Sequence, residues 1–83
     1  VPVRITYVGW LEREKGVLDL VSACGQLRAD AHDFELVLVG DGHAMADVQA
    51  ACREHGIADR TRLLGWQSPA GVREALRDSD IFV

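Results

Sequence analysis

Three loops in the sequence carry the residues that could bind a charged ligand. They span residues 9–16, 40–44 and 65–70, and each opens with a glycine that directly follows an apolar run. The first loop also holds Lys15, just before a predicted helix. N–H groups at a helix N-terminus, together with an ammonium group, favour a diphosphate. A solvated surface lysine, and glycines that only permit tight turns, explain the same pattern without a ligand.

Two common nucleotide-binding motifs are absent from these loops. Gly40 and Gly42 match the start of the dinucleotide pattern G-x-G-x-x-G, but its last position is Met45. The next predicted strand runs into Trp66 without the acid that would bind a ribose. The P-loop pattern G-x-x-x-x-G-K-[ST] does not occur. The sequence therefore argues against NAD binding and against a P-loop.

The cysteines and histidines favour neither a disulfide scaffold nor a metal site. Cys24 and Cys52 each fall on the apolar face of a predicted helix, which is typical of reduced thiols in a protein core. His32, His43 and His55 lack both the i, i+4 spacing and the companion ligands of a zinc site. We therefore expect two free cysteines and no metal.

Net charge argues against a nucleic-acid partner. The 83 residues include 9 basic and 13 acidic side chains, which gives a net charge of −4 and a pI of about 5.2. Nucleic-acid binders usually carry a basic stripe, whereas the arginines here are scattered, each near an acid. A hydrophobic content of 48% at this low net charge excludes a disordered chain, and no apolar run approaches the length of a membrane span.

Strand and helix patterns alternate along the whole chain. The predicted strands are 3–8, 34–39, 62–65 and 81–83, and helical patterns begin at 17, 45 and 69. Ser68 and Pro69 form a helix-start signature, and Gly56 is suited to end the second helix. Such alternation favours right-handed crossovers and a parallel sheet with helices on both faces. The sequence thus predicts a Rossmann-like α/β fold, in which ligands bind beyond the carboxyl ends of the strands.

Four segments, taken in order, resemble motifs of the C-terminal domain of group 1 (family 4) glycosyltransferases. Residues 7–16 resemble G-R-L-x-x-x-K-G, and residues 34–42 resemble L-x-I-x-G-x-G. Residues 62–68 resemble V-x-F-x-G-x-V, and residues 75–83 resemble L-Y-x-x-A-D-V-F-V. Enzymes of this family are retaining, use nucleotide sugars and have the GT-B fold. The resemblance covers essentially the whole chain and implies half of a GT-B C-terminal domain.

The resemblance also implies roles for five residues. Lys15 would contact the diphosphate of the donor, and Gly9 would let the backbone approach those phosphates. Trp66 and Gln67 would line the nucleobase pocket, largely through backbone groups, with Val72 packing beside the base.

Trp10 departs from the family pattern, because the family usually has an arginine at this position. An indole cannot neutralise a phosphate. Either Lys15 alone carries that contact, or another basic residue substitutes for the arginine.

Important parts of such an enzyme are expected outside this chain. The chain starts without a methionine and Val83 falls within a predicted strand, so residues 1–83 are expected to be a partial donor-binding domain. The glutamate pair of the family (E-x₇-E), which contacts the donor sugar and ribose, is expected after Val83, and the acceptor-binding domain before Val1. We therefore expect no acid–base catalytic residue in the chain, and no activity from this piece alone.

The function implied by the resemblance is that of a cytoplasmic glycosyltransferase. Its donor would be a UDP-, GDP- or ADP-sugar, no metal would be needed, and a sugar or lipid acceptor would bind to the other domain. Any membrane contact would also be made by that domain. Two alternatives remain open. A nucleotide-sugar 2-epimerase has the same architecture, and a non-catalytic Rossmann-like module for protein interaction would use the three loops only as turns.

Overall fold

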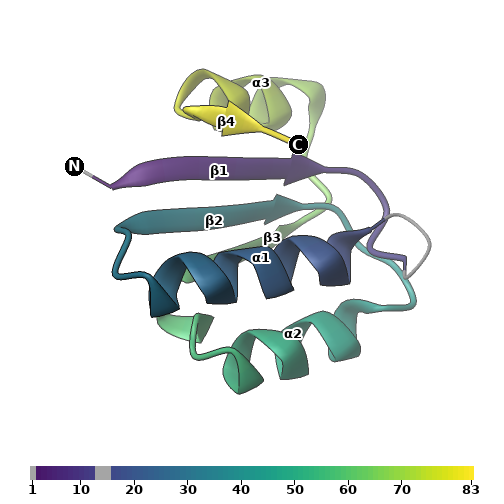
Figure 1. Ribbon diagram of the computed structural model, residues 1–83. Helices are drawn as coiled ribbons and strands as arrows, with labels where there is room; N and C mark the ends of the chain where they lie inside the picture. Colours follow the sequence, from purple (N-terminus) through teal and green to yellow (C-terminus); the bar gives the residue numbers. More distant parts are fainter. Residues whose placement is uncertain (1, 13–15) are drawn as a thin grey trace.

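The computed structural model describes residues 2–12 and 16–83, so the prediction for Lys15 lies outside the described residues. Strands and helices alternate as predicted (Figure 1). The elements are β1 (Val3–Val8), α1 (Val17–Ala29), β2 (Phe34–Val39), α2 (Met45–Glu54), η2 (Ala58–Arg60), β3 (Thr61–Gly65), α3 (Pro69–Arg77) and β4 (Ile81–Phe82). The short 3-10 helix η2, which leads into β3, was not predicted.

The four strands form one parallel sheet in the order β3-β2-β1-β4. α1 and α2 lie together on one side of the sheet, and α3 lies on the other side (Figure 1). This arrangement confirms the predicted Rossmann-like fold. Because all strands run in the same direction, their carboxyl ends and the loops that follow them lie at one edge of the sheet.

The main core lies between the sheet and the pair α1 and α2. Alternate residues of the central strands point into it, and the helices contribute one apolar face each. Its fully buried members include Leu36, Leu38, Val17, Val21 and Val48. Each such side chain stabilises the fold by about 1.5–3 kcal/mol relative to an exposed position.

Both cysteines belong to this core, as predicted. Cys24 on α1 and Cys52 on α2 are buried and free. Burial, with a smaller contribution from the neighbouring Cys52, raises the pKa of the Cys24 thiol to about 11. Burial also raises the pKa of Cys52. Both thiols are therefore protonated at neutral pH and behave as small apolar side chains.

Helix α3 begins as predicted but is less buried than the other helices. The Ser68 hydroxyl accepts a hydrogen bond from the Gly71 amide at 3.1 Å, and Pro69 occupies the first helical position. The predicted apolar face of α3, formed by Val72, Ala75 and Leu76, is only half-buried. None of the described helices is long and apolar enough to cross a membrane.

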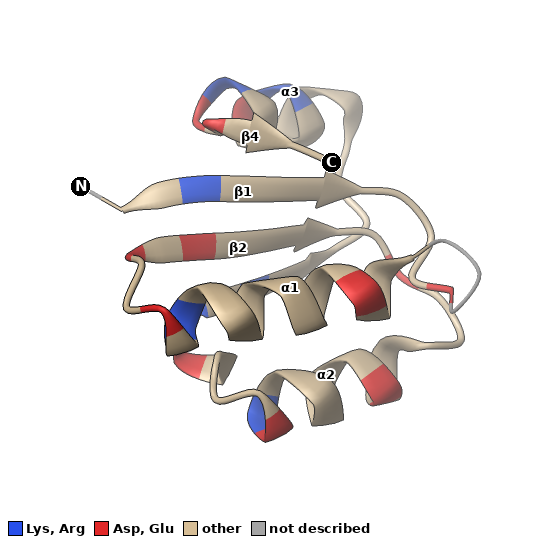
Figure 2. Cartoon of the chain, in the orientation of Figure 1, with Lys and Arg blue, Asp and Glu red and all other residues tan. Residues whose placement is uncertain are grey.

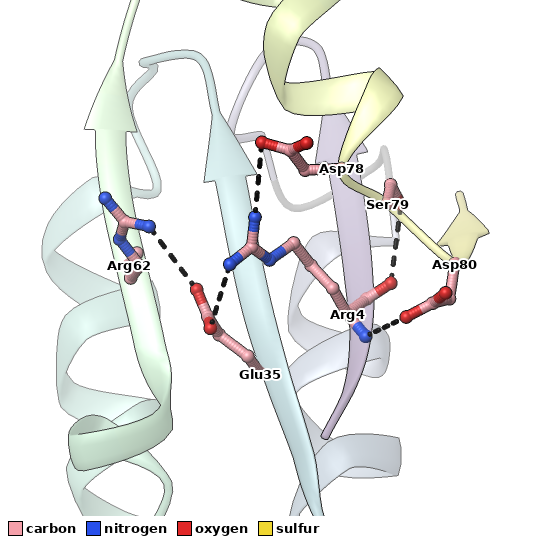
Figure 3. A network of polar contacts seen from close by, with 6 residues as sticks. All are labelled: Arg4, Glu35, Arg62, Asp78, Ser79 and Asp80. Atoms are coloured by element: carbon pink, nitrogen blue, oxygen red, sulfur yellow. Dashed lines mark hydrogen bonds and ion pairs between the residues drawn. The ribbon is translucent and has the colours of Figure 1, made fainter. Parts of the chain in front are cut away.

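The sheet face beneath α3 carries charges instead of a continuous apolar surface. The carboxylate of Glu35 on β2 lies between two arginines, 3.3 Å from Arg4 Nη2 and 3.5 Å from Arg62 Nη1 (Figure 3). Asp78, at the end of α3, lies 3.7 Å from Arg4 Nη1. These side chains are partly exposed, so each ion pair contributes only about 0.2–1 kcal/mol.

Two reciprocal hydrogen bonds attach the start of β4 to β1. The Arg4 amide donates to Asp80 Oδ2 at 2.9 Å (Figure 3). In return, the Asp80 amide donates to the Arg4 carbonyl at 2.9 Å. The Ser79 hydroxyl donates to the Ile81 carbonyl at 2.7 Å. Together these bonds set the register of β4, in which Ile5 pairs with Ile81.

We expect Asp80→Ala to lower the free energy of unfolding by about 1 kcal/mol, because it removes a charge-assisted hydrogen bond at an exposed site. Asp78→Ala is the matched control, since its exposed ion pair should contribute about 0.5 kcal/mol or less. Urea-induced unfolding followed by circular dichroism measures both changes. Equal losses in the two variants would contradict the role given to Asp80.

Candidate functional site

The three predicted loops meet at the carboxyl edge of the sheet. The Gly9 amide donates to the Val39 carbonyl at 3.0 Å, and the Gly40 amide donates to the Gly65 carbonyl at 2.9 Å. The first two loops are joined again by the Leu11 amide, which donates to the Asp41 carbonyl at 2.9 Å. Backbone hydrogen bonds therefore hold all three loops side by side, in the region where parallel sheets bind their ligands.

Gly40 is required by this arrangement of backbones. Its φ is +141°, and a Cβ at this position would lie 1.8 Å from the Gly9 carbonyl oxygen. At Gly42 a Cβ would lie 2.5 Å from the Leu11 carbonyl oxygen. The absence of side chains at Gly40 and Gly42 therefore allows the two loops to approach each other closely.

Two tryptophans lie in contact at this edge. Trp10 follows the glycine after β1, Trp66 follows the glycine that ends β3, and their ring centroids are 4.8 Å apart. The ring planes are nearly perpendicular, at 83°. Trp10 is 55% exposed and Trp66 is 51% exposed. The sequence analysis identified Trp66 and the unusual Trp10 but did not predict that they are in contact. The available signal was the dipeptide Gly-Trp, which occurs at the end of both β1 and β3.

A buried side chain of β1 holds the backbone of Trp10 in place. The Tyr7 hydroxyl donates to the Trp10 carbonyl at 2.6 Å. Burial raises the pKa of this hydroxyl, so it remains a donor across the physiological range. Tyr7 thereby links a buried position of β1 to the exposed indole that follows it.

Of the other predicted nucleobase residues, Gln67 and Val72, only Gln67 borders the groove described below. Gln67 Nε2 donates to the Leu64 carbonyl at 2.8 Å, which ties this side chain to its own loop. Gln67 also borders a groove of about 200 Å³ between α3 and the sheet. Trp66 and Val72 are not among the residues that line this groove.

The described parts of the three loops carry negative charge. In residues 9–12, 16, 40–44 and 65–70 the acidic side chains are Glu12 and Asp41, and these residues include neither lysine nor arginine. Glu12 Oε1 accepts a hydrogen bond from the His43 amide at 3.4 Å, and Asp41 Oδ1 accepts one from the Gly42 amide at 2.8 Å. A cation for a diphosphate must therefore come from outside these described loop residues.

Elsewhere on the described chain, acidic and basic side chains are interspersed (Figure 2). Arg28 lies 3.6 Å from Asp59, and Arg60 lies 3.8 Å from Asp33. This pairing agrees with the prediction that the arginines are scattered near acids. Residues 2–12 and 16–83 contain no group of three or more His, Cys, Asp or Glu side chains that could hold a metal ion.

We expect Gly40→Ala to lower the free energy of unfolding by about 4 kcal/mol or more, because the new methyl group would overlap the Gly9 carbonyl. Gly65→Ala is the control, since Gly65 also has a positive φ but has open space around it. Gly65→Ala should lower the free energy of unfolding by only about 1–2 kcal/mol. Urea titration of both variants measures the difference, and similar midpoints would contradict the steric explanation.

Known proteins with similar sequences include a family of enzymes and individual members of it. The family model described as "Glycosyl transferases group 1" matches residues 2–83. The 2-deoxystreptamine glucosyltransferase of Streptomyces kanamyceticus is 39% identical over 62 residues, which are 75% of this chain and 16% of that protein.

Two solved structures are similar over almost the whole chain. The apo form of the lipopolysaccharide outer core galactosyltransferase WaaB is 30% identical, with a TM-score of 0.75, over 95% of this chain and 22% of that one. The C-terminal domain of the group 1 glycosyl transferase LpcC from Francisella tularensis has a TM-score of 0.78 at 16% identity, over 99% of this chain and 46% of that one. The chain spans less than half of each of these three proteins.

Proposed function

Because the chain belongs to the group 1 glycosyl transferases, we propose that it is part of the donor-binding domain of an enzyme that transfers a sugar from a nucleotide sugar. One observation carries this proposal. The strand order reverses between β1 and β4, and Gly9 and Trp10 follow β1 at that switch point. Open α/β sheets bind their ligands at such a point, and backbone hydrogen bonds join the loop after β1 to the loop after β2, and that loop to the loop after β3.

The diphosphate of the donor would bind beside the loop that follows β1. The Gly9 amide already donates to Val39, so the contribution of Gly9 would be open space for the phosphates. Lys15 would supply the positive charge that the described loop residues lack. As the bond between sugar and phosphate breaks, negative charge grows on the departing diphosphate, and a fixed ammonium group stabilises that charge.

The nucleobase would bind near Trp66 and Gln67, with Val72 beside it. The position of Trp66 at the carboxyl edge and its half-exposed indole support this assignment. We propose no acid–base catalytic residue and no metal ligand within residues 1–83. The glutamate pair of the family and the acceptor site would lie in other parts of the protein.

We further propose that the enzyme acts in the cytoplasm and retains the anomeric configuration of its donor. The buried, unpaired thiols Cys24 and Cys52 are typical of proteins from reducing compartments. Retention rests on the family assignment.

The test of the proposed function is sugar transfer by the whole protein that contains this chain. It is incubated with UDP-, GDP- and ADP-sugars and with a panel of sugar and lipid acceptors, and release of nucleoside diphosphate is followed. We expect acceptor-dependent release, and a product with the same anomeric configuration as the donor by NMR. Epimerised donor formed without an acceptor would favour the epimerase, and absence of binding to all three diphosphates would favour the non-catalytic module.

We expect Lys15→Ala to lower kcat by about 10²–10³-fold in the whole protein, because charge on the departing diphosphate would lose its partner. Lys15→Arg keeps the positive charge and should retain more of the activity. Arg53→Ala is the control, since it removes an exposed cation in the last turn of α2, at the end of that helix away from the three loops. Unchanged kinetics of Lys15→Ala would remove Lys15 from the site.

A further inference from the structure

Trp10, which stands where the family usually has arginine, is in contact with Trp66. We infer that they form a single aromatic corner that binds the nucleobase of the donor by stacking, so that Trp10 contacts the base and not the diphosphate. This inference rests on the proposed function and deepens it. It assigns a binding role to the position where the family usually has arginine.

The geometry of the pair suits a flat aromatic ring. The planes meet at 83° with centroids 4.8 Å apart, and about half of each residue is exposed to solvent. A planar ring that stacks on one indole therefore presents its edge to the other indole. Offset stacking and edge-to-face contact are the two arrangements that aromatic rings prefer.

The chemistry of an indole disfavours phosphate as the group that contacts Trp10. An indole offers no positive charge to a phosphate, whereas an uncharged heteroaromatic ring can stack on its face.

The exposed indole faces suit a nucleobase. A nucleobase gains affinity from its face alone, and each of the two half-exposed indoles can offer it an aromatic contact.

The two indoles reach each other across the loop that follows β2. β2 separates β1 from β3 in the sheet, yet the tryptophans that follow β1 and β3 are in contact. The corner therefore lies over the middle of the carboxyl edge. A nucleotide whose base rests there would extend its phosphates toward Gly9, at the switch point of the sheet.

The test compares nucleoside diphosphates with inorganic pyrophosphate. UDP, GDP, ADP and pyrophosphate are titrated by calorimetry into the whole protein that contains this chain and into its Trp10→Ala variant. We expect Trp10→Ala to weaken the binding of the nucleoside diphosphates by about 5–100-fold, which corresponds to the loss of one stacking contact. Pyrophosphate affinity should change by less than about twofold, since no base is involved.

Further variants keep the result interpretable. Trp10→Phe retains an aromatic face and should preserve most of the affinity, whereas Trp10→Leu retains apolar volume without a π face and should behave like Trp10→Ala. The double variant with Trp10→Ala and Trp66→Ala should lose less affinity for nucleoside diphosphates than the product of the fold-losses of the two single variants. Both side chains contact the same base in the inferred site, so their effects are not independent. His43→Ala, an exposed change at the same edge, is the control.

The outcomes separate this inference from the proposed function. Equal weakening of the binding of pyrophosphate and of nucleoside diphosphates would place Trp10 at the diphosphate and overturn the inference. Unchanged binding in both Trp10→Ala and Trp10→Leu, with circular dichroism confirming that they fold, would overturn it while leaving the function intact. Absence of nucleoside diphosphate binding by the unmodified protein would overturn both.

Discussion

Close contact between the Gly9 and Gly40 backbones is the constraint on which the rest of the candidate site depends. A Cβ at Gly40 would lie 1.8 Å from the Gly9 carbonyl oxygen, so the two loops can pass each other only because one residue there has no side chain. The same stretch of backbone continues the parallel ladder beyond the strands, through the bonds from Gly9 to Val39 and from Gly40 to Gly65. Three loops far apart in the sequence are thus fixed relative to one another, which is what a preformed ligand site requires.

The two ends of the sheet carry different chemistry. Near the amino ends of the strands, the guanidinium groups of Arg4 and Arg62 pair with the carboxylates of Glu35 and Asp78 (Figure 3). At the carboxyl ends the described residues offer glycine backbone, two exposed indoles and the carboxylates of Glu12 and Asp41. The arginines of the strands are therefore used for the structure of the sheet, away from the edge where the three loops meet.

Much of the fold was predictable because it follows from local rules. Apolar periodicity located the strands and helices, and Ser68 and Gly56 marked helix ends by their capping chemistry. The contact of Trp10 with Trp66 was not predictable in the same way, because it depends on how loops from two non-adjacent strands turn after leaving the sheet. Periodicity reports which face a residue occupies, but it does not report the direction of an irregular segment. The site roles of Lys15, Trp66, Gln67 and Val72 remain predictions.

The position of β1 in the sheet has a consequence for how the protein folds during synthesis. β1 is made before the other strands described here, yet one of its two neighbours, β4, is made much later. Arg4 and Asp80, which share a hydrogen bond between these strands, lie 76 residues apart. At ribosomal rates of 5–20 residues per second, one edge of β1 stays unpaired for about 4–15 s. Such an edge is a template for wrong pairing with other chains. Charged side chains on an edge strand oppose such pairing, and β1 carries one near its start, Arg4.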